Sequence, residues 1–185
     1  MKEMSASFCA SLLLSLMLAI LLICPTYARL SVKVTENLLN KICSSHTDPP
    51  FCLQALKSDP RTPSVDLIGL TNISIHLADV AINNTLAMIG PLVNETADPK
   101  LKVQYDLCHQ LYDSNVGEIE SAKRAWKAGD YKTVIVMADG CITDCGDCND
   151  AISITTSSPL SPKNIEVSNY CETQLVVSEY LDGIK

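Results

Sequence analysis

The residues whose types and spacing best suit chemistry are three cysteines in a C-x3-C-x2-C arrangement: Cys141, Cys145 and Cys148. Three thiolates at this spacing can hold an iron–sulfur cluster, but that chemistry requires a reducing compartment. Zinc would need a fourth ligand, and none of the three histidines shows paired ligand spacing: His46, His76 and His109. We therefore predict no metal site and no cofactor, and keep a metalloprotein built on the cysteines as a third hypothesis.

Catalytic motifs are missing from the sequence, which has no G-x-S-x-G nucleophile elbow and no glycine-rich phosphate loop. His76 and His109 fall in helical patterns, where a histidine is structural or faces solvent. Asp144, Asp147 and Asp150 cluster in one helical stretch, and such runs of charge are usually solvated faces. We predict no catalytic residue, and interpret the chain as a binding module rather than an enzyme.

The first 28 residues have the pattern of a secretory signal peptide. A near-unbroken apolar run from Leu12 to Cys24 is followed by a small-residue cleavage site that ends at Ala28. The alternative is a signal anchor, but the run is short for a membrane span and Pro25 follows it at once. We therefore expect a secreted mature chain of residues 29–185, with no membrane contact after cleavage.

Seven of the nine cysteines remain once the signal is removed. In a secreted protein most of them should form disulfides. Because seven is odd, at least one stays unpaired or joins a second molecule, which leaves a disulfide-linked dimer open. Cys43 and Cys52 flank Pro49-Pro50, a pair that we interpret as excluding helix and forming a turn suited to a local disulfide.

Charge and sequons restrict the partner. The net charge is −7, which argues against nucleic acid and anionic membranes and favours a neutral or basic partner. Three N-glycosylation sequons have the acceptors Asn72, Asn83 and Asn94, at eleven-residue spacing. Eleven residues are close to three helical turns, so Asn72 and Asn83 should share one solvent-facing side of a helix. That side can be neither core nor a tight interface.

The longest helical pattern runs from Asp98 to Gly129. Asp98 can cap its N-terminus, Pro99 suits the first helical position, and Gly129 can close the C-terminus in the left-handed region. Apolar residues recur at three-, four- and seven-residue steps, and Cys108 is among them. We expect the other helices to pack on this rod, and a disulfide from Cys108 to hold one of them.

Two shorter helical patterns precede the rod, at residues 29–42 and 51–57, and predict an N-terminal hairpin over residues 29–60. Ser64 is then expected to cap a second long helix. That helix should end near Gly90-Pro91 or a few residues later, because proline disfavours helix continuation.

Two more helices should follow the rod. Asp130 is expected to cap the first, and Ser161-Pro162 to open the last, with Leu175 in its core face. No strong alternating strand pattern is present. The sequence therefore predicts an all-α fold, an antiparallel four-helix up-and-down bundle of residues 64–185 preceded by a short N-terminal helical hairpin.

Four short motifs occur in order along the mature chain: Cys43-x8-Cys52, Asp66-Leu67-x-x-Leu70, Cys108-His-Gln-Leu-Tyr112-Asp113, and Gly129-Asp130-Tyr131 followed by Cys148-Asn-Asp-Ala. Together they resemble the plant invertase and pectin methylesterase inhibitor family over essentially the whole mature chain. The resemblance implies that residues 29–185 form one inhibitor domain.

The resemblance also implies two disulfides, Cys43–Cys52 and Cys108–Cys148. Three further cysteines are not family cysteines: Cys141, Cys145 and Cys171. Their pairing stays open, since Cys171 could bridge to either of the other two and Cys145 could compete for Cys108. A bridge between Cys141 and Cys145, along one helix, is geometrically awkward.

Members of the family inhibit by docking the bundle over an enzyme's substrate cleft, without covalent chemistry. The resemblance therefore implies a protein partner, a plant pectin methylesterase or invertase. Invertase inhibitors carry Pro-Lys-Phe where this chain has Tyr131-Lys132-Thr133, so only Lys132 agrees. This difference and the acidic charge favour pectin methylesterase. An invertase of the cell wall or vacuole is the alternative, and a non-inhibitory binding module of the same fold is the second alternative.

The candidate partner-binding residues are Asp130, Tyr131, Lys132 and Thr133. We expect the protein in the apoplast, with the vacuole as an alternative. Carboxylates at the interface should make the affinity change between about pH 5 and 7, in a direction that the sequence does not give.

Overall fold

The computed structural model describes residues 33–153 and 158–183. In chain order the elements are α2 (Glu36–Cys43), α3 (Pro49–Ser58), the short 3-10 turn η1 (Thr62–Ser64), α4 (Leu67–Glu95), α5 (Pro99–Ala128), α6 (Tyr131–Ser153) and α7 (Leu160–Asp182). None of the described helices combines the length and hydropathy that a transmembrane span requires. The predicted signal peptide lies outside the described residues.

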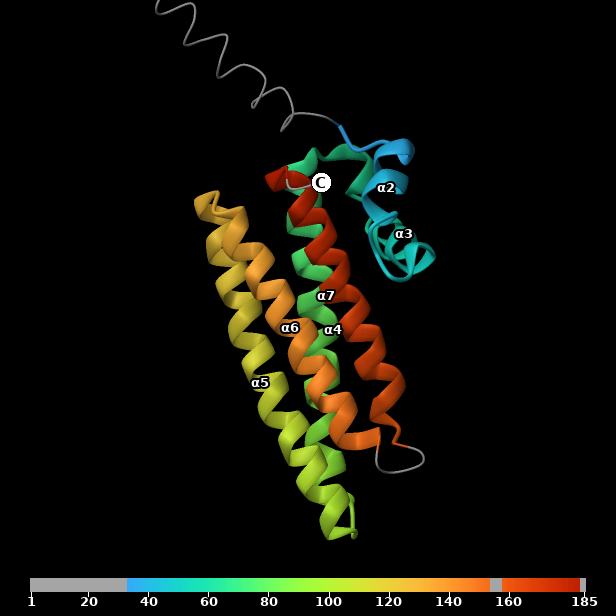
Figure 1. The fold of residues 1–185 in the computed structure, drawn as a ribbon, viewed down its shortest axis with the longest axis vertical. Coiled ribbons are helices and arrows are strands. Elements are labelled where there is room, and N and C mark those ends of the chain that lie inside the picture. The colour runs from blue at the N-terminus through green and yellow to red at the C-terminus, as the bar shows by residue number, and fades with distance from the viewer. Residues whose placement is uncertain (1–32, 154–157, 184–185) are drawn as a thin grey trace, which may run out of the picture.

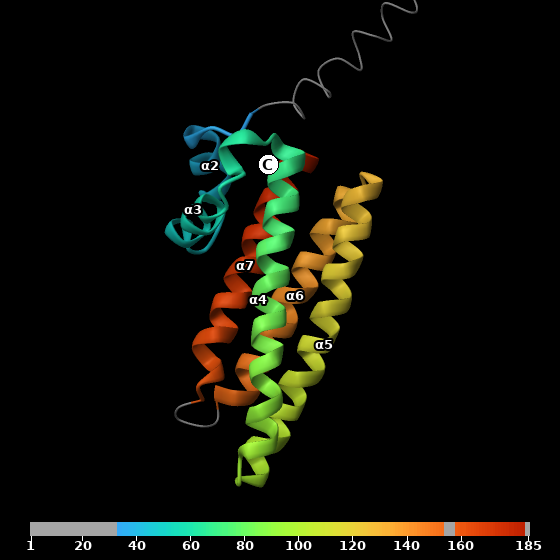
Figure 2. The same cartoon turned by 180° about the vertical axis from the view of Figure 1, so that it is seen from behind.

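The four long helices α4 to α7 run alternately up and down as an antiparallel bundle, and α2 and α3 lie beside one end of it, next to α7 (Figures 1 and 2). This confirms the predicted all-α bundle with its N-terminal hairpin. Buried apolar side chains form two clusters, one along the bundle and one between the hairpin and the adjoining ends of α4 and α7.

Helix α5 begins and ends as its sequence predicts. The Asp98 side chain accepts a hydrogen bond from the backbone N–H of Lys100 at 2.9 Å, and Gly129 follows the helix with a left-handed φ of 74°. Both features satisfy backbone groups that a helix end leaves unpaired. Cys108 lies fully buried on the predicted apolar stripe.

The expectation that every other helix packs on α5 is wrong for α7. Helix α5 packs against α4 and α6, whereas α7 packs against those same two helices on the opposite side. Two tyrosines of α5 nevertheless reach across the core. The Tyr112 hydroxyl donates to Asn164 Oδ1 of α7 at 3.0 Å, and the Tyr105 hydroxyl lies 3.1 Å from Ser158 Oγ, just before α7.

The hairpin corrects the interpretation of Pro49-Pro50. These prolines are the first two residues of α3, and Asp48 caps that helix by accepting from the Phe51 N–H at 3.1 Å. The first turn of a helix has no use for its N–H groups, so prolines start a helix well although they break its interior. A disulfide joins Cys43 at the end of α2 to Cys52 in α3.

The predicted start of α4 needs correction, whereas its end a few residues after Pro91 agrees with the prediction. Ser64 belongs to the preceding 3-10 turn, and Asp66 is the cap, with its carboxylate accepting from the Gly69 N–H at 2.9 Å. At the other end α4 continues through Pro91 to Glu95. Pro91 is exposed, so its ring faces solvent rather than a neighbouring helix. Proline has no backbone N–H, and the helix continues past it without that one hydrogen bond.

Of three predictions for α6 and α7, one is confirmed and two are revised. Asp130 caps α6 as predicted, because its carboxylate accepts from the Thr133 N–H at 3.2 Å. Helix α7 begins at Leu160, just before Ser161-Pro162. Leu175 is only half-buried, and the buried side of α7 carries polar residues alongside the expected Val167, Cys171 and Val177: Asn164, Thr173, Gln174 and Ser178.

Candidate partner-binding surface

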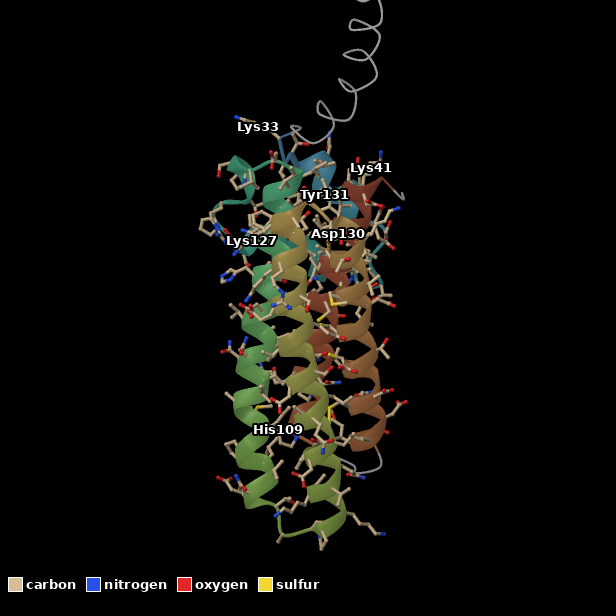
Figure 3. All side chains as sticks on the ribbon, turned by 90° about the vertical axis from the view of Figure 1, so that its left-hand side faces the viewer. Lys33, Lys41, His109, Lys127, Asp130 and Tyr131 are labelled. Carbon is tan, nitrogen blue, oxygen red and sulfur yellow. A yellow bond between two sulfur atoms is a disulfide. The ribbon has the colours of Figure 1, made fainter. Side chains whose placement is uncertain are left out.

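The middle of the α5/α6 pair carries charge of one sign. Residues 103–122 of α5 and 133–153 of α6 contain eight carboxylates and no lysine or arginine. We call this surface the acidic face; its carboxylates are Asp106, Asp113, Glu118, Glu120, Asp139, Asp144, Asp147 and Asp150. Six of the eight are exposed, while Glu118 and Asp144 are half-buried. Figure 3 looks onto α5, with α6 beside it.

Apolar side chains are also exposed on this helix pair. Val103 and Leu107 lie one helical turn apart on α5 and are 67% and 43% exposed, and Val136 on α6 is 60% exposed. Protein interfaces combine apolar contacts with a charged surrounding. The acidic face therefore offers both components to a partner.

The seam between α5 and α6 is built around the buried Asn115. With its amide oriented to satisfy its neighbours, Asn115 Nδ2 donates to Glu118 Oε2 at 3.3 Å and to Asp144 Oδ2 at 3.1 Å. Gly140 of α6 makes room for this arrangement, since a Cβ at that position would overlap the Glu118 carboxylate. One neutral amide thus holds two carboxylates from neighbouring helices close together.

Burial dominates the electrostatics of this seam. It raises the pKa of Glu118, with the nearby Asp144 charge adding to the effect. Burial also raises the pKa of Asp144, to which the Asp147 charge contributes. Both carboxyls therefore hold their protons to a higher pH than they would in an unfolded chain.

The four predicted partner-binding residues lie at the start of α6, at the hairpin end of the bundle (Figure 3). Asp130 and Lys132 are exposed. Thr133 takes part in the N-terminal cap of α6, where its hydroxyl donates to Asp130 Oδ2 at 2.6 Å. Tyr131 is half-buried against the apolar cluster between the hairpin and the bundle. The structure brings the four together at one helix end, at the edge of the acidic face.

The three sequon asparagines all lie on α4. Asn83 and Asn94 are exposed, and Asn72 is half-buried. The hydroxyl-bearing residues of the first two sequons, Ser74 and Thr85, are buried at 0% and 3% exposure. Glycosylation at these positions therefore remains a prediction, and it requires attachment before α4 packs.

The C-x3-C-x2-C motif is divided between two roles. Cys148 forms a disulfide with Cys108, so the structure contains both pairs that the family resemblance implies. Cys141, Cys145 and Cys171 are free and buried. In the described part of the chain, no group of three or more histidine, cysteine or acidic side chains is placed to hold a metal ion.

The histidines are placed with equally clear roles. His46 is buried and joins the hairpin to α7, with Nε2 3.0 Å from the carbonyl oxygen of Asn169. His109 is partly exposed on α5, where Nδ1 lies 3.3 Å from Asp113 Oδ2.

The sequence alone did not indicate a role at the seam between α5 and α6 for Asn115, Glu118 or Gly140. A readable signal was the absence of cations over about twenty residues in each of two neighbouring helices.

Comparisons with known proteins agree with one another. The profile of the plant invertase/pectin methylesterase inhibitor family matches residues 37–177. A pectinesterase inhibitor of Actinidia deliciosa is 36% identical over 185 residues, covering 98% of this chain and 100% of that protein. A candidate invertase inhibitor of Platanus orientalis is 25% identical over 82% of this chain and 92% of its own. The fold matches a mutant form of an Arabidopsis pectin methylesterase inhibitor with a TM-score of 0.70 at 22% identity, over 76% of this chain and 95% of that one.

Proposed function

Because the chain belongs to the plant invertase/pectin methylesterase inhibitor family, an inhibitor family rather than a catalytic one, we propose that its target is a plant pectin methylesterase. The inhibitor docks its bundle over the substrate cleft of the enzyme and forms no covalent bond. The observation that carries the choice of target is the full-length similarity, at 36% identity, to a relative named pectinesterase inhibitor.

The acidic face is the surface that we assign to docking. Eight carboxylates without an intervening cation create a field that attracts a basic enzyme and raises the association rate. The exposed side chains of Val103, Leu107 and Val136 supply apolar contact once the partners meet. Asp130, Tyr131, Lys132 and Thr133 remain proposed contacts at the hairpin end of this surface.

The sequon side of α4 supports the same assignment by exclusion. Glycans on Asn83 and Asn94 would keep a partner away from the exposed side of α4. The hairpin covers part of α7, which leaves the α5/α6 pair as the long surface open to an enzyme (Figure 1).

We further propose that residues 1–28 are a cleaved signal peptide, and that residues 29–185 act outside the cell, in the apoplast, with the vacuole as the alternative. The two disulfides suit an oxidising compartment.

The test is a paired inhibition titration of the oxidised mature protein against a plant pectin methylesterase and a plant acid invertase, each at pH 5 and pH 7. We expect inhibition of the esterase alone, with stronger inhibition at low salt because charge attraction is screened. Inhibition of the invertase alone would reject the proposed target.

The invertase alternative is favoured by one observation, the similarity to the Platanus protein over most of both chains. The second alternative, a non-inhibitory binding module, predicts that neither enzyme is inhibited at micromolar inhibitor. Pull-down from cell-wall extract would then identify a partner that is neither enzyme.

A further inference from the structure

Basic side chains gather on one side of the hairpin end, where α4 and α5 meet. Lys123 and Lys127 occupy the last two turns of α5, and Arg61 lines the same pocket from the segment after α3. The net charge of the chain is −7, so three cations around one pocket are a strong local departure from the average. Lys127 is labelled at this end in Figure 3.

A surface pocket of about 310 Å³ opens among these cations, between α4, α5 and the segment after α3. Its polar and aromatic lining consists of Arg61, Asn72, His76, Asp79, Lys123, Trp126 and Lys127, and Ile75 completes it. This volume is at the small end of the range for ligand sites, and the lining mixes one aromatic ring with convergent polar groups, as such sites do.

Trp126 is the only tryptophan of the chain. Its indole Nε1 donates to the carbonyl oxygen of Ile68 in the first turn of α4 at 2.9 Å, which fixes the orientation of the ring. The ring is half-buried and lines the pocket. A fixed and partly exposed indole presents a rigid apolar surface next to polar groups.

Most of the positive charge in the pocket is already paired with carboxylates. Arg61 forms an ion pair with Asp59, and Lys123 Nζ lies 2.9 Å from Asp79 Oδ2 and also contacts Glu120. Lys127 has no ion-pair partner among the described residues. The pocket also adjoins the C-terminal end of α5, where the helix dipole is negative and a multiply charged anion is disfavoured. One carboxylate fits this balance better than a phosphate does.

We propose that this pocket binds a carboxylated sugar, a uronic acid unit of an acidic oligosaccharide. The pyranose ring lies against the indole of Trp126, the carboxylate faces Lys127, and His76 pairs with a ring hydroxyl. The inference goes beyond the proposed enzyme inhibition and does not rest on it. Such a pocket would hold the protein on a carboxylate-bearing polysaccharide while the acidic face stays free.

Tryptophan fluorescence tests the proposal directly, because the single tryptophan lies in the pocket. The protein would come from a disulfide-forming bacterial host, which leaves Asn72 without a glycan. We expect a saturable fluorescence change with trigalacturonate in low salt. Its methyl ester and a neutral trisaccharide should bind about tenfold more weakly, since each lacks the charge-assisted contact. No saturable change with trigalacturonate overturns the proposal.

A pair of charge reversals on the same helix supplies the control. Lys127→Glu should weaken trigalacturonate binding about tenfold or more, whereas Lys102→Glu, at the far end of α5, should leave it unchanged. Equal effects of the two variants would reject the pocket as the site. Equal competition by inorganic phosphate would mean nonspecific anion binding and would also overturn the proposal. Binding is measured without any enzyme, so this result is independent of the inhibition titration.

Discussion

Asn115 is a buried core residue that hydrogen-bonds to two carboxylates of the acidic face. It is fully buried, and its amide donates to the carboxylates of Glu118 and Asp144 from two different helices. Two like charges this close repel each other when both are ionised, and partial burial adds to the cost. The seam is therefore more stable when at least one of the two carboxyls is protonated.

This arrangement predicts how stability depends on pH above pH 4. The pKa values of Glu118 and Asp144 are raised from ordinary values of 4.5 and 3.8, so the folded chain binds more protons than the unfolded chain between those values and the raised ones. The free energy of unfolding must therefore fall as pH rises through that window. Urea unfolding at several pH values, compared between the wild type and Glu118→Gln, should show a shallower fall in the variant.

The control for this experiment is Glu120→Gln. Lys123 holds the pKa of Glu120 below its ordinary value, so this group contributes in the opposite direction. If Glu118→Gln and Glu120→Gln changed the pH profile alike, the seam would not be the source of the slope. Asp59 does not interfere above about pH 5, because Arg61 lowers its pKa from 3.8 to about 2 and its contribution is lost only as the pH falls below that range.

The three free thiols give a second prediction at the residue scale. Cys171 is fully buried, and hydrogen bonds with Cys141 and Cys145 together with burial raise its pKa far above the ordinary value. The pKa of Cys141 is also raised, although its bond to Cys171 opposes the shift. All three thiols are buried, and the raised pKa of Cys141 and Cys171 further disfavours their reactive thiolate form. We therefore expect no reaction of the three thiols with a disulfide reagent in the native state.

After unfolding in denaturant, the same reagent should label three thiols per chain. Labelling of any of the three in the native protein would contradict their burial. The free cysteines of the described residues are all buried, so the folded chain exposes no thiol that could link two molecules. Labelling in the native state would therefore also support a disulfide-linked dimer.

At the scale of the elements, the hairpin is held to the bundle by one side chain in particular. His46 Nδ1 accepts from the Asp48 N–H at 2.8 Å, so its proton resides on Nε2 and is donated to the Asn169 carbonyl of α7. His46→Ala leaves both of these partly buried groups unpaired. We expect a loss of about 1–3 kcal/mol in the free energy of unfolding, measured in urea. His109→Ala, on the exposed side of α5, should change it by less than about 0.5 kcal/mol.

The Cys108–Cys148 disulfide fastens α5 to α6. It closes a ring of 41 residues, one more than its sequence separation of 40. In the chain-entropy account, Cys108→Ala with Cys148→Ala should cost about 4 kcal/mol, against about 3 kcal/mol for the shorter ring of Cys43 and Cys52. Denaturant unfolding of the two double variants measures both costs. A larger loss for the shorter ring would contradict the ring-length argument.

At the scale of the whole molecule, the separation of charge predicts how docking responds to substitution. Asp106→Lys with Asp147→Lys places two cations on the acidic face and changes the net charge from −7 to −3, since each replacement adds two units. We expect slower association with the target esterase, by about tenfold at low salt, and a weaker salt dependence. Surface plasmon resonance at several salt concentrations measures both.

A matched variant separates local from total charge. Glu95→Lys with Asp182→Lys produces the same net charge of −3, but changes the ends of α4 and α7 instead. It should retain near wild-type association. If both double variants slowed association equally, only the net charge would matter and the acidic face would not be the docking surface.

Local sequence by itself determined the elements and some of their ends. Asp98, Pro99 and Gly129 defined α5 because capping depends on hydrogen bonds within a few residues, and the apolar periodicity required a helical bundle. The error at Pro49 was local too. Pro49 begins a helix instead of excluding one, because a proline in the first turn removes no intrahelical hydrogen bond.

Only the tertiary structure decided which helices are neighbours and what their contacts do. The sequence does not place Asn115 between two carboxylates, the polar residues of α7 in the core, or Trp126 beside cations from two segments. Each of these depends on the order of helices around the bundle, and periodicity gives only the direction of a side chain relative to its own helix. Burial, pKa and pocket chemistry arise between helices, so they exist only once the bundle has formed.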